Sequence, residues 1–208
     1  KDKNLRELMI KLMVIGESGL GKSTMINSMY EPYIPENEKL KESGGKRGLE
    51  KLITVSHVIE RNVKESERMN FPNTERIKIR FNTTDTGGFY CVSNSGNSKD
   101  KKESIEHENK LWNNILNDIC TSNAKGEPYN MILYCVRNRF TAIERDYCNR
   151  FKMLGIPVII VATYCIDNED VITDLENAIS DMKCSDDLDG PVPIIAKESP
   201  QQHPTKNV

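Results

Sequence analysis

Short apolar runs separated by amphipathic segments predict a sheet covered by helices. Runs that are continuous or nearly so are typical of strands buried on both faces, and they lie at 9–15, 131–136, 156–162 and 192–196. Two further stretches, 52–59 and 76–81, have strand character, and the alternation in 76–81 predicts one solvated face. We expect these two to pair in antiparallel fashion through the connection at 61–74.

Helical periodicity fills the gaps between these strands. Residues 22–30 and 169–183 are compatible with helices, and Thr141 with Glu144 matches a capping box that starts another. A further helix is expected to bury a face made of Ile105, Trp112, Ile115, Leu116 and Ile119. The alternation predicts an α/β fold in three layers, with a mostly parallel sheet, one antiparallel strand and helices on both faces.

The length of 208 residues suits one α/β domain, expected over 1–200 and followed by a tail at 201–208. The first residue is Lys rather than Met, so we expect a fragment or a processed chain. Polar, glycine-rich stretches at about 36–50 and 88–100 are expected to be mobile loops that become ordered with a bound ligand.

Charge and cysteine usage exclude several classes of function. Charged residues make up 29% with a net charge of -2 and interspersed signs, so no nucleic-acid surface is expected. No apolar run approaches the ~20 residues of a membrane span, which leaves only peripheral membrane association open. The six cysteines lack C-x-x-C spacing and the histidines are scattered, so we expect reduced core thiols, no zinc site and a cytoplasmic location.

The strongest chemical signal follows the first strand. It is a complete G-x-x-x-x-G-K-S phosphate loop, made of Gly16, Glu17, Ser18, Gly19, Leu20, Gly21, Lys22 and Ser23, with Thr24 next in the helix. Glycines let successive N–H groups point at an anion, and the helix start adds its positive end. Lys22 is expected to be an exposed loop cation that reaches the β- and γ-phosphates, and Ser23 to bind Mg²⁺. The alternative is a glycine-rich turn without a ligand.

A second motif, Asp85-Thr86-Gly87-Gly88, closes the third strand. Asp85 could hold Mg²⁺ through water, and the Gly88 N–H could sense a γ-phosphate. Between the two motifs, Thr54 could close over Mg²⁺ and the γ-phosphate, or it could be an ordinary β-branched strand residue. The phosphate loop alone does not separate guanine from adenine nucleotides.

The segment from Leu12 to Ser28 resembles the phosphate-loop region of septins nearly residue for residue. Residues 50–55 are similar to the start of the septin second strand, which supports Thr54 as a switch threonine. Residues 138–144 resemble instead the G-R-F-T segment of the related AIG1-like (GIMAP and Toc) GTPases. The resemblance implies a P-loop GTPase domain that binds GTP or GDP with Mg²⁺ and forms homo- or hetero-oligomers.

The guanine-reading motif of this family, N/T-K-x-D, is altered here. Thr163 fits its first position, but Tyr164 replaces the lysine and Asp167 arrives one residue late. Asp167 could read the base or cap the next helix, while Ala196 and Lys197 resemble the S-A-K base loop.

The leading hypothesis is a slow GTPase in which Lys22, Thr54 and Gly88 assist hydrolysis. Slow turnover is expected because Phe89 follows Gly88 where Ras-like enzymes place a water-orienting glutamine. The D-T-G-G variant of the usual D-T-P-G is also expected to loosen this segment. The alternatives are a nucleotide-holding scaffold that hardly turns over, and an ATP-binding P-loop protein.

Overall fold

A computed structural model describes residues 4–31, 40, 52–89, 98–137 and 140–163, with the single positions 173 and 177. Its sheet has five strands in the order β2-β3-β1-β4-β5. The strands are β1 (Leu5–Gly16), β2 (Ile53–Asn62), β3 (Arg76–Asp85), β4 (Met131–Val136) and β5 (Val158–Ala162). All neighbours are parallel except β2 and β3, so the expected antiparallel pair is confirmed.

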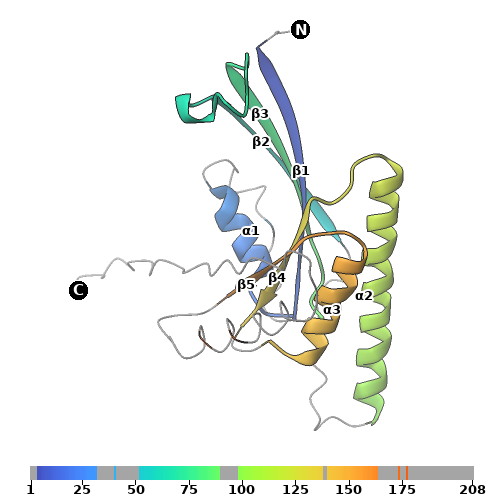
Figure 1. Ribbon diagram of the computed structural model, residues 1–208. Coiled ribbons are helices and arrows are strands. Elements are labelled where there is room, and N and C mark those ends of the chain that lie inside the picture. The colour runs from blue at the N-terminus through green and yellow to red at the C-terminus, as the bar shows by residue number, and fades with distance from the viewer. Residues whose placement is uncertain are drawn as a thin grey trace, which may run out of the picture.

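Helices cover both faces of this sheet (Figure 1). Helix α1 (Lys22–Tyr30) lies on one face, and α2 (Ser98–Ala124) and α3 (Ala142–Met153) lie on the other. A short 3-10 turn, η3 (Glu65–Glu67), lies in the connection between β2 and β3. The three-layer α/β architecture that the sequence predicts is therefore the observed one.

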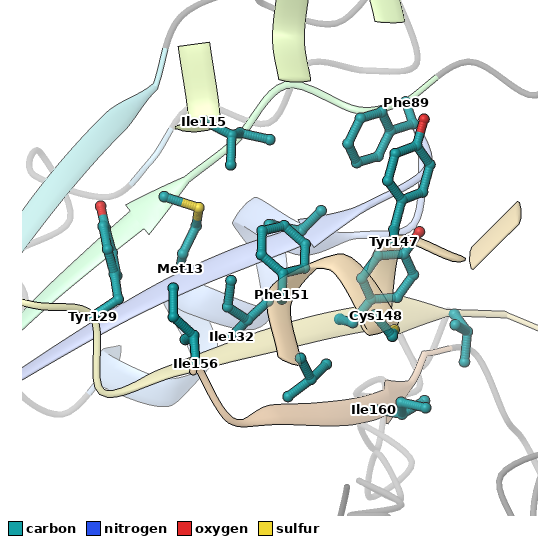
Figure 2. Close-up of a cluster of buried hydrophobic side chains, with 14 of the residues drawn as sticks. Met13, Phe89, Ile115, Tyr129, Ile132, Tyr147, Cys148, Phe151, Ile156 and Ile160 are labelled. Atoms are coloured by element: carbon teal, nitrogen blue, oxygen red, sulfur yellow. The ribbon is translucent and has the colours of Figure 1, made fainter. Parts of the chain in front are cut away.

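Each face of the sheet has its own apolar core, because consecutive residues of a strand point to opposite faces. On the central strand β1, Met13 and Ile15 pack into the larger cluster with α2 and α3 (Figure 2). Val14 between them packs into the cluster formed with α1. All three side chains are fully buried, as a strand covered by helices on both sides requires.

Strand β3 continues four residues beyond the alternating pattern at 76–81, through the polar residues 82–85. Thr83 and Thr84 are fully buried, so their hydroxyls need partners inside the protein. The Thr83 hydroxyl lies 2.6 Å from the Tyr30 hydroxyl of α1, and the Thr84 hydroxyl lies 2.8 Å from that of Tyr129. The two buried hydroxyls of this part of β3 are thus satisfied by Tyr30 of α1 on one face and by Tyr129 of the α2–β4 connection on the other.

The buried face of α2 confirms the expected one in part, at Ile115 and Ile119. Leu111, Ile115 and Ile119 are buried at four-residue spacing, whereas Ile105 is 53% exposed. At about 100° per residue, Ile105 points about 120° away from Leu111, at the far side of the buried stripe. Leu116 is only half-buried. Trp112 lies at the border, partly buried against the larger cluster.

The structure describes only a few positions of the two expected mobile loops, whose mobility stays a prediction. Leu40 is buried in the α1 cluster, and its backbone N–H and C=O bond the Asn27 amide at 2.8 and 2.9 Å. In the second segment, Gly88 and Phe89 are buried, and residues 98–100 already belong to α2. The rest of both loops lies outside the described residues.

The helix expected at 169–183, except positions 173 and 177, and the strand expected at 192–196 also lie outside the described residues. The domain limits of 1–200 therefore stay a prediction. Among the helices described, none is long and apolar enough to cross a membrane. Cys135 and Cys148 are buried free thiols as expected, but the free thiol of Cys120 is exposed.

The capping box at the start of α3 is confirmed and gives a stability prediction. The Thr141 hydroxyl accepts from the Glu144 N–H at 3.3 Å, and the Glu144 carboxylate accepts from the Thr141 N–H at 2.6 Å. Thr141→Ala should lower the free energy of unfolding by about 1 kcal/mol, measured by urea denaturation. Thr121→Ala, at an exposed position of α2, is the control and should change it by less than about 0.5 kcal/mol. Equal effects would contradict the role of the cap.

Candidate functional site

The phosphate loop connects the central strand β1 to α1 and passes close to the end of β4. A Cβ on Gly16 would lie 2.5 Å from the Cys135 carbonyl oxygen, and the φ of Gly16 is +151°. Only glycine fits there, because both the contact and the backbone angle exclude a side chain. Gly19 and Gly21 also have positive φ, and Leu20 between them is buried in the α1 cluster. The glycines thus give the loop its turns, and Leu20 anchors it in the apolar core beneath α1.

Lys22 corrects an expectation from the sequence, because its side chain is buried rather than exposed. Its ammonium donates to the carbonyl oxygens of Gly16 at 3.2 Å and Glu17 at 2.8 Å. Burial lowers the pKa of Lys22, and the nearby Asp85 carboxylate opposes that shift. The ammonium thus lies against the backbone of the phosphate loop.

Ser23 and Asp85 come together from the two motifs. The Ser23 hydroxyl donates to Asp85 Oδ2 at 2.5 Å, across 62 positions of sequence. Burial raises the pKa of Asp85, while the Ser23 hydrogen bond and the Lys22 charge lower it. The other carboxylate oxygen, Oδ1, is buried and has no hydrogen-bond partner among the described residues. A buried carboxylate oxygen of this kind is costly unless it is given a cation or a donor.

This donor set fits Mg²⁺. The ion prefers oxygen ligands, takes one or two protein groups and keeps water or phosphate oxygens at its remaining positions. A hydroxyl and a carboxylate at hydrogen-bond distance, one of whose oxygens is unpaired, supply that chemistry. The described residues hold no cluster of three or more His, Cys, Asp or Glu side chains that would favour another metal.

The segment that follows Asp85 lies directly on the phosphate loop. The Phe89 N–H donates to the Gly16 carbonyl at 3.1 Å, and the Ser18 N–H donates to the Phe89 carbonyl at 3.0 Å. A Cβ on Gly88 would lie 2.2 Å from the Ser18 Cα, so this position also requires glycine. The structure thus brings Gly88 to the loop, as its assignment to the site requires, although the segment is docked rather than loose.

Thr54 lies away from this site. It pairs with Thr84 across the antiparallel strands, and the two hydroxyls are 2.9 Å apart. Thr84 also contacts Tyr129, on the face covered by α2 and α3, whereas Asp85 faces Ser23 on the α1 side. The structure therefore favours the strand interpretation of Thr54 over the metal-ligand interpretation.

The base-recognition residues are only partly described. Thr163 follows β5, and its N–H and hydroxyl both donate to the Val136 carbonyl, at 2.8 and 3.1 Å. This bracing places it at the same edge of the sheet as the phosphate loop, as expected for parallel strands. Asp167, Ala196 and Lys197 lie outside the described residues.

Sequence reasoning missed the place of Phe89. Its side chain is 4% exposed and belongs to the larger core cluster, where it stacks on Tyr147. The only sequence signal is an aromatic residue directly after a glycine motif, which does not distinguish an exposed ring from a buried one. Behind the loop, burial raises the pKa of Cys135 to about 12, so this thiol is neutral and packs as an apolar group.

A parallel sheet with one antiparallel edge, a glycine loop from its central strand to α1, and Asp85 against Ser23 define a P-loop GTPase fold. The septin family profile matches residues 6–125, more than half of the chain, and the chain belongs to that family.

Individual relatives match either a short part of the chain or most of the chain at low sequence identity. Septin-1 of Bos taurus is 37% identical over 78 residues, which are 38% of this chain and 18% of that protein. The septin GTPase domain of Chlamydomonas reinhardtii superposes with a TM-score of 0.50 at 18% identity, over 93% of this chain and 68% of that one. Cdc11 of Saccharomyces cerevisiae gives a TM-score of 0.43 at 17% identity, over 85% and 64%.

The buried Asp85 carboxylate makes stability depend on pH. Its folded-state pKa is raised above 3.8, so above pH 3.8 the unfolded chain ionises first and the folded chain holds the extra proton. The free energy of unfolding therefore falls as pH rises through the window between 3.8 and the raised pKa. Asp85→Asn should lack this fall, so its stability relative to wild type should grow across that window.

Urea denaturation between pH 3.5 and 7, without nucleotide and Mg²⁺, measures this difference. Asp146→Asn is the control, since Asp146 is an exposed carboxylate of α3 that pairs with Arg150. Parallel curves for wild type and Asp85→Asn would show that burial does not shift Asp85.

Proposed function

We propose that this domain binds a guanine nucleotide with Mg²⁺ and hydrolyses GTP slowly to GDP and phosphate. The observation that carries the proposal is the convergence of Lys22, Ser23 and Asp85 on one glycine loop, from motifs 62 positions apart. A cation, a hydroxyl and a buried carboxylate with an unpaired oxygen meet the needs of a triphosphate and its metal. Membership of the septin family supports the choice of nucleotide.

Each part of the site would have its own role in binding the nucleotide and the metal. The loop from Gly16 to Gly21 and the start of α1 at Lys22–Thr24 would surround the phosphates with N–H groups and the positive end of the helix. Lys22 would exchange its carbonyl partners for phosphate oxygens, which are stronger acceptors. Ser23 and Asp85 would hold Mg²⁺, which supplies neutralisation of the phosphate charge, and the Gly88 N–H would face the third phosphate.

Lys22 provides the direct test of nucleotide binding. Because its stem is buried, Lys22→Met keeps the apolar contacts and removes only the ammonium. We expect GDP and GTP affinity to fall by about 100-fold or more, since charge-assisted bonds to phosphate are lost. Isothermal titration measures the affinities, and Lys102→Met, at an exposed position of α2, should bind as wild type does. Unchanged affinity in Lys22→Met would refute the assignment of the loop.

Base recognition remains a proposal that rests on Thr163, Asp167, Ala196 and Lys197. The carboxylate of Asp167 would accept both ring-edge N–H groups of guanine, and the Ala196 N–H would bond the guanine carbonyl oxygen. Asp167→Asn should weaken GTP binding and improve binding of xanthosine triphosphate, which offers an acceptor where guanine has its amino donor. Competition titrations compare the two, and an unchanged preference would make Asp167 only a helix cap. ATP binding as tight as GTP binding by the wild type would favour the ATP-binding alternative.

A nucleotide-holding scaffold is the second candidate, and the position of Phe89 favours it. An apolar ring buried against Tyr147 cannot orient an attacking water as a glutamine can. Single-turnover hydrolysis of GTP separates the two, because a scaffold leaves the bound triphosphate intact. We further propose assembly with copies of this domain or with related chains in the cytoplasm, which sedimentation velocity with and without nucleotide would test.

A further inference from the structure

Phe89 makes two separate attachments, one through its backbone and one through its ring. The backbone joins the D-T-G-G segment to the phosphate loop, where Phe89 N–H and C=O bond Gly16 and Ser18 at 3.1 and 3.0 Å. The resulting pairing is a parallel bridge between Glu17 and Phe89. One N–H of the phosphate loop, that of Ser18, is thereby bonded to a carbonyl oxygen of the protein itself.

The ring fixes this segment to the helices on the other side. Phe89 stacks on Tyr147 of α3 with ring centroids 4.5 Å apart and an interplanar angle of 13° (Figure 2). Tyr147 in turn packs against Trp112 of α2 at 5.4 Å, and Arg150 lies over both of these rings. Offset stacking of buried rings is favourable beyond the apolar area that it buries. Moving the D-T-G-G segment off the loop therefore requires breaking a stack that two helices support.

The docked segment leaves no room for a further group between itself and the loop. A Cβ on Gly88 would approach the Ser18 backbone N at 2.4 Å, so even a methyl group does not fit between them. The Phe89 carbonyl also presents partial negative charge to the Ser18 N–H, where an anion would have to compete with it. A third phosphate that contacts both Gly88 and the loop must lie between these two segments, so it requires their separation.

We propose that Phe89 is a positioning residue that makes this site favour nucleoside diphosphate over triphosphate, by stacking on Tyr147 and holding the D-T-G-G segment against Ser18. The inference rests on the proposed function and adds to it a residue that sets which nucleotide is held. Lengthening the phosphate chain costs the Ser18–Phe89 bond and the stack, whereas a diphosphate leaves both in place. A large aromatic side chain at this position is thus used for discrimination rather than for catalysis.

The test compares GDP with the imido analogue of GTP, which is not hydrolysed, by titration calorimetry with Mg²⁺. Phe89→Leu keeps an apolar side chain but removes the stack, and Tyr147→Leu removes the same stack without touching the D-T-G-G segment. Both should raise the affinity for the GTP analogue relative to GDP by about threefold to tenfold, the range expected for losing one such restraint. Phe151→Leu is the matched control, because it alters a buried ring of the same helix that packs on Trp112. Its affinity ratio should equal that of the wild type.

Hydrogen exchange of the Ser18 amide, measured without nucleotide, gives a readout independent of binding. It should be protected in the wild type and in Phe151→Leu, and faster in Phe89→Leu and Tyr147→Leu. An affinity ratio that is unchanged or shifts toward GDP in both stack variants would overturn the inference while leaving nucleotide binding established. Absence of binding of either nucleotide to the wild type would overturn the proposed function and this inference together.

Discussion

A buried cation and a buried carboxylate, Lys22 and Asp85, lie together at the ends of the central strands, and the surrounding structure is built to tolerate them. Burial lowers the pKa of Lys22 and raises the pKa of Asp85, because it favours the neutral form of each group. The charge of each group opposes the pKa shift of the other. Backbone carbonyls of the loop accept from the ammonium, and Ser23 donates to the carboxylate. Removing either charge alone would leave the other without its counter-charge in a poorly hydrated site.

The close approach of the backbone at two glycines makes this arrangement possible. Gly16 lets β1 pass the Cys135 carbonyl of β4, and Gly88 lets the segment after β3 lie on Ser18. A side chain on Gly16 would collide with the end of β4, and one on Gly88 would collide with Ser18, so both close approaches depend on glycine. In the proposed diphosphate preference, this same contact of Gly88 with Ser18 is the one that a longer phosphate chain would have to displace.

The packing around Phe89 links this chemistry to the helical layer. The stack of Phe89 on Tyr147, with Trp112 behind it, connects the edge of the phosphate loop to α2 and α3. A displacement of the D-T-G-G segment would therefore be felt by those helices through this stack. Packed cores respond to such displacements as discrete rearrangements rather than by gradual deformation.

The sequence by itself determined the strand–loop–helix order, the phosphate loop and the capping box at Thr141, because each depends on contacts within a few residues. Spacing along the chain does not show which face a side chain takes or what covers it. Only the tertiary structure turned Thr54 toward Thr84, and only it buried Lys22 and inserted Phe89 into the core, since those outcomes depend on strand register and on helices distant in sequence. The tertiary structure also leaves Ile105 of α2 exposed while Leu111 is buried. The elements that pack against a helix decide which of its apolar residues are buried, and its periodicity alone does not.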